Sequence, residues 1–272
     1  MGNCGFDTFL AKNVPHILEK IFFNLDYASY KACMEVSNVW FSLLTSESFM
    51  KLGKTQYYKE IVDELWSAVL ENHVNKVRRI ISITNIDVNF RKSVGYVTFR
   101  KKYVHITPLW LASMKGFSDV VNILLKAGAD ANQVDERGWS LLHKVVTKGN
   151  KIVAQLLAGG ADINRQDSAG VTPLIEACRH NKPKIVKLLL DKGADPNLAD
   201  NFGATPLHYA AIRDAGTAIM VKYLLARGAE INTRDEHGET PLSYALQYMG
   251  TMSWGWGVRE VARLLKKFGG TG

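Results

Sequence analysis

Cysteine and proline are scarce in this chain of 272 residues, which has three cysteines, seven prolines and no long apolar run. Three scattered cysteines are not a disulfide framework, and Cys33 and Cys178 fall on apolar helix positions, as reduced, buried residues do. No segment approaches the length of a membrane span, and the N-terminus lacks the basic-then-apolar pattern of a secretory signal. We therefore expect a soluble protein of the cytoplasm, with the nucleus as the alternative.

The sequence also lacks a recognisable catalytic or metal-binding pattern. Its seven histidines are dispersed, its cysteines do not have metal-ligand spacing, and neither a nucleophile elbow nor a phosphate-cradling loop is present. We expect no catalytic residues, no metal and no cofactor, and hence a protein that is not an enzyme.

The net charge of +8 is unevenly distributed. Residues 1–62 are balanced, whereas residues 63–104 carry eight basic and four acidic side chains. Such an excess is typical of a solvated face, and it could also steer an acidic protein partner or act as a nuclear signal. Because no nucleic-acid recognition motif accompanies it, we expect no nucleic-acid binding.

A repeating motif dominates the remaining chain. A Gly-Ala-acid triplet recurs at steps of 32, 33 and 35 residues, beginning at Gly128, Gly160, Gly193 and Gly228. A period of this length indicates a stack of similar units, because one unit cannot bury its own apolar face.

Within one period, from Asp167 to Asp200, each residue type predicts a local structure. Thr172 and Pro173 are typical of a helix start, since threonine caps free amides and proline suits the first helical position. Asn181 can adopt the left-handed conformation that ends this helix, Pro183 begins a second helix, and Gly193 ends it. Each unit is therefore expected to be a helix pair followed by an extended turn.

These residues resemble the ankyrin repeat. The segment from Thr205 to Ala210 matches the T-P-L-H-x-A signature of that family in full, and the Gly-Ala-acid triplet at Gly228 fits its closing motif. The resemblance implies a solenoid of about six helix pairs with β-hairpin fingers. The predicted units are a cap at 63–90, followed by 91–134, 135–166, 167–199, 200–234 and 235–268, within a repeat region at 63–270.

The segment from Val14 to Lys51 resembles an F-box, with a hydrophobic-Pro start, an Ile-Leu pair, Ile-Phe, Leu-Asp and then V-x-x-x-W. The resemblance implies three helices that bind the Skp-type adaptor of a cullin–RING ubiquitin ligase. The residues it assigns to that contact are Pro15, Ile17, Leu18, Ile21, Phe22, Leu25, Val36 and Trp40. The alternative is that these apolar helices only cap the repeat array.

The predicted fold is thus all-α, with a disordered N-terminus at 1–12, an F-box at 13–50, an ordered linker at 51–62 and the ankyrin solenoid after it. Two segments depart from the repeat. Residues 91–103 are predicted to form a longer hairpin finger, and the insertion at 249–257, with Trp254 and Trp256, is predicted to cover the open end of the array.

In ankyrin proteins the turn tips and the ends of the first helices line a concave binding face. The resemblance therefore assigns substrate binding to side chains at those positions, with Arg137 and Trp139 as the leading anchors. These side chains are Met114, Arg137, Trp139, Arg179, His180, Phe202, Arg213, His237 and Tyr248. The predicted finger at 91–103 adds Tyr96, Phe99 and Arg100, because aromatic and basic side chains suit a contact surface. His143 and His208 occupy the motif's histidine position and are expected to orient the turn instead.

Together these patterns predict a non-catalytic substrate receptor of a Skp–cullin–F-box ubiquitin ligase, monomeric alone or 1:1 with the adaptor. The alternative is an ankyrin interaction scaffold or inhibitor without a ligase link. A third possibility concerns Asn132, Asn164, Asn197 and Asn232, whose spacing from an acid and a leucine resembles the pattern accepted by asparaginyl hydroxylase. The simpler interpretation is that these asparagines hold the turns.

Overall fold

The computed structural model describes residues 47–84, 86–94, 104–212, 217–251 and 256–272. Within them the chain is almost entirely helical, apart from one short antiparallel strand pair. The helices are α4 (Glu47–Leu70), α5 (Val74–Ile83), α6 (Pro108–Lys115), α7 (Ser118–Lys126), α8 (Leu141–Val145), α9 (Asn150–Ala158), α10 (Pro173–Arg179), α11 (Pro183–Asp191), α12 (Pro206–Ala211), α13 (Thr217–Ala226), α14 (Pro241–Thr251) and α15 (Trp256–Lys267).

Residues 13–46 of the predicted F-box, with its eight adaptor-contact residues from Pro15 to Trp40, lie outside the described residues, and residues 47–50 begin α4. The chain divides into two compact units, residues 1–67 with 83–86 and residues 68–82 with 87–272. The predicted linker at 51–62 lies inside α4, a single helix of 24 residues. None of the described helices has the length and apolar character needed to cross a membrane.

The helix pairs begin and end where the repeated motif predicts. The side chain of Thr172 accepts a hydrogen bond from the amide of Ile175, and α10 starts at the next residue, Pro173. Asn181 has a φ of 50°, the left-handed conformation that turns the chain toward α11. The threonine cap, the proline and the asparagine thus act together to form a tight helix pair.

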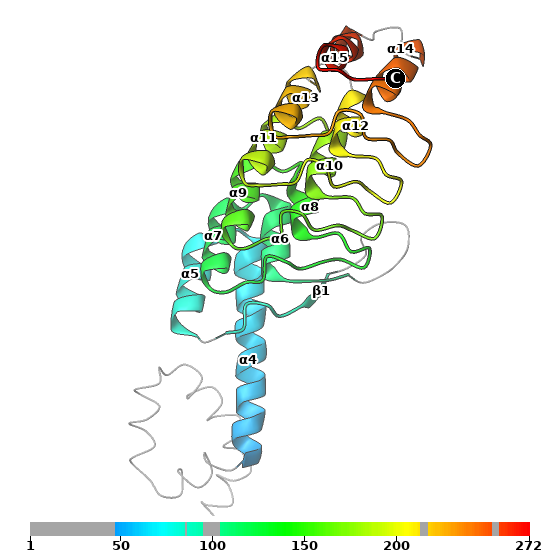
Figure 1. Ribbon diagram of the computed structural model, residues 1–272. Coiled ribbons are helices and arrows are strands. Elements are labelled where there is room, and N and C mark those ends of the chain that lie inside the picture. The colour runs from blue at the N-terminus through cyan, green and yellow to red at the C-terminus, as the bar shows by residue number, and fades with distance from the viewer. Residues whose placement is uncertain (1–46, 85, 95–103, 213–216, 252–255) are drawn as a thin grey trace, which may run out of the picture. The chain divides into compact units, whose positions relative to one another are not determined.

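In residues 87–272 the pairs stack into two adjacent columns of helices (Figure 1). The inner column is α6, α8, α10, α12 and α14, and the outer column is α7, α9, α11, α13 and α15. Aliphatic side chains fill the space between them, among them the fully buried Leu109, Leu142, Leu174, Leu189 and Leu207. Because each pair contacts mainly its neighbours, the core is a continuous strip and not one central cluster.

The predicted hairpin finger has an antiparallel stem. Strand β1 (Lys92–Val94) pairs with β2 (Val104–Ile106), with Lys92 opposite Ile106 and Val94 opposite Val104. The residues between the strands, with the predicted contacts Tyr96, Phe99 and Arg100, lie outside the described part of the chain. Residues 252–255 of the terminal insertion, including Trp254, lie outside it as well.

A ladder of asparagines connects successive turns. Asn132 donates from Nδ2 to the carbonyl of Gly160 over 2.9 Å and accepts at Oδ1 from the amide of Asp162 over 2.7 Å. Asn197 makes the same two bonds to Gly228 and Glu230. The interpretation that these asparagines hold the turns therefore agrees with their geometry. Their hydroxylation stays a prediction.

Candidate functional site

The surface of interest is the inner face, defined here as the exposed side of the inner helices together with the turns that project between them. At the base of each turn an aspartate accepts two backbone amides through Oδ1. Asp135, for example, accepts from Arg137 and Trp139 over 2.9 and 3.0 Å. Asp167, Asp200 and Asp235 repeat this arrangement in the next three turns. The turns are therefore fixed supports for the side chains at their tips.

The predicted binding residues that the structure describes fall on this face in two groups. Arg137, Phe202 and His237 are exposed at turn tips, and Phe202 is 61% exposed. Arg179, His180 and Tyr248 are exposed at or near the ends of inner helices, whereas Met114 is half-buried in α6. Arg213 lies outside the described residues.

Trp139 is less available than the sequence predicts. It is half-buried, and the ammonium of Lys144 lies 4.1 Å from its ring centroid in a cation–π contact. The same ammonium is 2.9 Å from Oδ2 of Asp135. Burial alone would raise the pKa of Asp135, but the bond from Lys144 and those from the two backbone amides lower it overall. Asp135 and Lys144 therefore form a charged pair against the indole.

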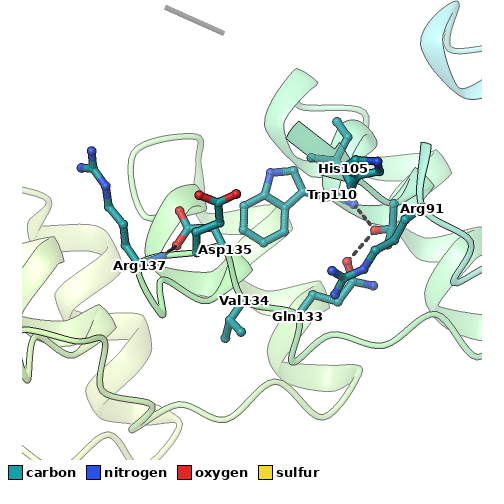
Figure 2. Close-up of a pocket in the computed structure, with 10 residues that line it drawn as sticks. Arg91, His105, Trp110, Gln133, Val134, Asp135 and Arg137 are labelled. Carbon is teal, nitrogen blue, oxygen red and sulfur yellow. Dashed lines mark hydrogen bonds between the residues drawn. The ribbon is translucent and has the colours of Figure 1, made fainter. Parts of the chain in front are cut away.

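A pocket of about 430 Å³ lies between the start of α6, the strand β2 before it and the turn at residues 133–137. Figure 2 shows the indole of Trp110 among the labelled side chains, with the Asp135 carboxylate toward it and the Arg137 guanidinium directed away. Two of the lining residues are joined by a buried hydrogen bond, in which Thr107 Oγ1 donates to Gln133 Oε1 over 2.5 Å. The lining residues are Arg91, His105, Ile106, Thr107, Trp110, Gln133, Val134, Asp135, Glu136 and Arg137.

The sequence analysis did not identify Trp110, although the motif contained a signal for it. His143 and His208 stand three residues after their caps, and each reaches a carbonyl of the next unit through Nε2, that of Val171 at 2.9 Å and that of Glu239 at 3.1 Å. Trp110 stands three residues after Thr107, the cap of α6, and so replaces the motif's histidine. An indole at a position where a histidine closes the turn leaves an aromatic surface in the pocket.

The variable position of T-P-L-H-x-A also faces the turns and was missed. It holds Lys144, Glu176, Tyr209 and Tyr244 in successive units. Tyr209 donates to Oδ2 of Asp200 over 2.5 Å, and Tyr244 donates to Oδ2 of Asp235 over 2.7 Å. Burial and the bonded carboxylate raise the pKa of both phenols. Both hydroxyls therefore stay protonated and join the inner helices to the turns.

Glu176 contacts two of the predicted binding residues, Arg179 and His180. Its side chain is 6% exposed and accepts from His180 Nε2 over 2.9 Å and from Arg179 over 3.4 Å. The guanidinium of Arg179 in turn lies 5.6 Å from the Tyr209 ring centroid. Arg179 and His180 are thus positioned on the inner face by a buried acid.

The chemistry of this face is that of a contact surface. Cys178 is fully buried, and burial raises the pKa of its thiol, so the reactive thiolate is suppressed. Within the described part of the chain, no group of three or more histidine, cysteine, aspartate or glutamate side chains is arranged to hold a metal ion.

Comparisons with known proteins agree with this architecture. The chain is 38% identical over 79 residues to inversin of Gallus gallus, which is 29% of this chain and 7% of inversin. It is 44% identical over 67 residues to an ankyrin repeat-containing protein of Schizosaccharomyces pombe, which is 24% of this chain and 32% of that protein. It is also 32% identical over 116 residues to a fowlpox virus protein named for its ankyrin repeats, which is 42% of this chain and 31% of that protein.

The chain therefore spans at most 32% of the length of these relatives. The family description "Ankyrin repeats (3 copies)" matches residues 109–200 and 174–269, which is more than half of the chain. Ankyrin-repeat proteins are in general non-catalytic, and their repeats serve protein–protein interaction. With its repeat period, paired helices and capped turns, the chain belongs to the ankyrin-repeat family.

Proposed function

We propose that this chain binds a protein partner on the inner face of its repeat array, with one side chain of the partner held in the Trp110 pocket. The observation that carries this proposal is the replacement of the turn-closing histidine by Trp110, beside a pocket of about 430 Å³. A scaffold without a ligase link is sufficient to account for the family membership and for the surface.

The pocket has the mixed chemistry of a protein contact. Its indole offers apolar area, while Asp135 and the exposed Arg91 and Arg137 offer charged groups at the rim. Tryptophan and arginine are the residues that most often dominate the binding energy of an interface when they lie near its centre. A partner side chain that covers the indole would therefore supply a large share of the affinity.

The test is a selection of binders to the full chain from a random peptide library displayed on phage, followed by affinity measurements on variants. We expect Trp110→Ala to weaken the selected binders about tenfold or more, because truncation of a central aromatic typically costs over 1 kcal/mol. The matched control is Phe268→Ala, since Phe268 is 55% exposed just after α15. Its truncation should leave affinity unchanged.

A second variant separates lost contact from lost fold. Trp110→His restores the full T-P-L-H motif, and its Nε2 is expected to donate to the carbonyl of Trp139, as His143 does to Val171. This variant should fold at least as stably as the wild type by urea unfolding and still lose binding. Binders that tolerate both Trp110 variants would contradict the pocket assignment, and a failure to select any binder would contradict the proposed function.

A ligase role is the second candidate, and the observation that favours it is the F-box resemblance of Val14 to Lys51. In this proposal residues 13–50 bind a Skp-type adaptor, the chain is a non-catalytic ligase subunit, and the inner face presents the substrate. The full chain would then co-purify with the adaptor at 1:1.

The paired substitution Leu18→Ala and Ile21→Ala should abolish that capture, because both side chains belong to the apolar stripe assigned to the adaptor. Circular dichroism should show an unchanged helical signal from the repeats. If the wild-type chain is well folded and captures no adaptor, the ligase role is wrong and the scaffold remains.

A further inference from the structure

Lysines gather at one edge of the inner face, where the inner helices end and the outer helices begin. Lys115 is the last residue of α6, Lys148 follows α8, Lys182 precedes α11 and Lys184 lies in its first turn. Lys115 and Lys148 each stand eight residues after the cap of their inner helix. We call these four residues the lysine edge.

No acidic side chain among the described residues pairs with the lysine edge. Elsewhere, Lys151 pairs with Asp119 at 3.2 Å and Lys187 with Asp191 at 2.6 Å. The acids nearest to the edge in sequence are already engaged, Asp119 by Lys151 and Glu176 by Arg179 and His180. Lys115, Lys148 and Lys184 are exposed, and Lys182 is half-buried.

The edge follows the stacking of the repeats, because α6, α8 and α10 are neighbours in the inner column (Figure 1) and Lys182 lies three residues after the end of α10. Packed helices lie roughly 8–10 Å apart. An extended peptide advances about 3.3 Å per residue, so every third residue of such a peptide meets the next helix end. The lysine edge therefore matches a strand with an acidic side chain at every third position.

We propose that the lysine edge binds an extended acidic segment of a protein partner, with carboxylates about three residues apart opposite Lys115, Lys148 and Lys182. This inference rests on the proposed function, since it specifies the chemistry of the partner held on the inner face. The free ammonium groups are the complementary charges, and the repeat spacing sets the register. The anchor in the Trp110 pocket and the acidic segment on the edge contact different ends of α6.

A protein segment fits better than a nucleic acid. The turns of the same face carry carboxylates at Asp135, Glu136, Asp200, Asp235 and Glu236, which would repel a continuous phosphate backbone. A peptide can carry acids at the edge and neutral or basic residues opposite the turns. Nucleic-acid binding is therefore an outcome that the experiment must be able to detect.

The experiment uses peptides selected on the full chain from a random 16-residue phage library. We expect the enriched sequences to carry Asp or Glu at every third position. Their affinity should fall about tenfold or more on the K115E/K148E/K182E variant, because three attractions become repulsions. The control K126E/K222E/K266E removes the same net charge at exposed positions outside the edge and should change affinity less than about twofold.

The outcomes separate this inference from the proposed function. Binders that depend on Trp110, lack acids and tolerate the lysine reversal would overturn the lysine edge and leave the proposed function intact. Selection that yields no binder would overturn both. A fluorescein-labelled oligonucleotide of fifteen thymidines that binds through the same three lysines and displaces the peptides would overturn the acidic-segment proposal in favour of nucleic acid.

Discussion

At the scale of single residues, His143 and His208 show how the array uses neutral histidine. In each, Nδ1 accepts from the amide and hydroxyl of the helix cap, Ser140 or Thr205, while Nε2 reaches a carbonyl of the next unit. Burial lowers the pKa of both imidazoles and outweighs the carbonyl bonds, which act to raise it. Protonation at Nδ1 would remove the acceptor on which both cap bonds depend.

This arrangement predicts a loss of stability in mild acid. The folded pKa of each histidine lies below the unfolded value of about 6.5, so their full contribution is present above that pH and is lost as pH falls through the folded pKa. The free energy of unfolding, measured by urea titration, should therefore decrease from pH 7 toward pH 5. Asp135 and Asp235 titrate in a separate window, because their lowered pKa values confine their effect to pH below about 4.

The control is the double variant His143→Gln and His208→Gln, whose amides can donate from Nε2 toward the same carbonyls and do not titrate. Its unfolding free energy should vary less between pH 7 and pH 5 than that of the wild type. An equally steep decrease in both proteins would show that these imidazoles are not the groups responsible.

Side-chain roles were predictable where a motif dictates them. The turn-orienting role of His143 and His208 followed from T-P-L-H and is confirmed by their bonds. The cover of Trp139 by Lys144 could not be predicted, because it depends on which rotamer places an ammonium over the ring. The roles of Glu176, Tyr209 and Tyr244 were also missed, because they occupy the variable position of T-P-L-H-x-A, where the motif fixes no residue type.

At the scale of elements, the turns depend on glycine at a positive φ and, in places, on the lack of a side chain. Gly160 has a φ of +85° with open space where a Cβ would lie. Gly170 has a φ of +74°, and a Cβ there would meet Asn201 Oδ1 at 2.5 Å and its amide nitrogen at 2.7 Å. Both positions require a positive φ, but an added Cβ would clash with a neighbouring turn only at Gly170.

Gly160→Ala should therefore lower the free energy of unfolding by about 1–2 kcal/mol, the cost of a left-handed alanine. Gly170→Ala should lower it by about 1–3 kcal/mol more, because the next turn must move. Urea unfolding of the two variants beside the wild type measures the difference. Equal losses would mean that successive turns are not closely packed.

Element boundaries were predictable where a residue imposes a backbone geometry. Thr172, Pro173, Asn181 and Pro183 fix the ends of α10 and α11 because each imposes a backbone geometry. The region at 51–62 holds one glycine and no proline, so nothing there breaks a helix, and α4 runs through it without interruption. The hairpin stem was predictable from its β-forming residues.

At the scale of the whole molecule, the period of the Gly-Ala-acid motif predicted a stack of similar units, and the resemblance of Thr205 to Ala210 to T-P-L-H-x-A predicted the family. Stacked units bury a continuous core with contacts mainly between neighbours, so a repeated apolar pattern is enough to indicate a solenoid. The binding site was less predictable, because a partner contacts exposed residues that the repeat motif does not specify. Trp110 and the lysine edge are such residues.

The central claim is that a protein partner lies on the inner face of the array. Hydrogen exchange of the full chain, alone and saturated with a peptide selected from the phage library, tests this most directly. The account predicts added protection at residues 104–110 and 133–139, around the Trp110 pocket. Protection confined to the outer helices α7, α9, α11 and α13 would contradict it.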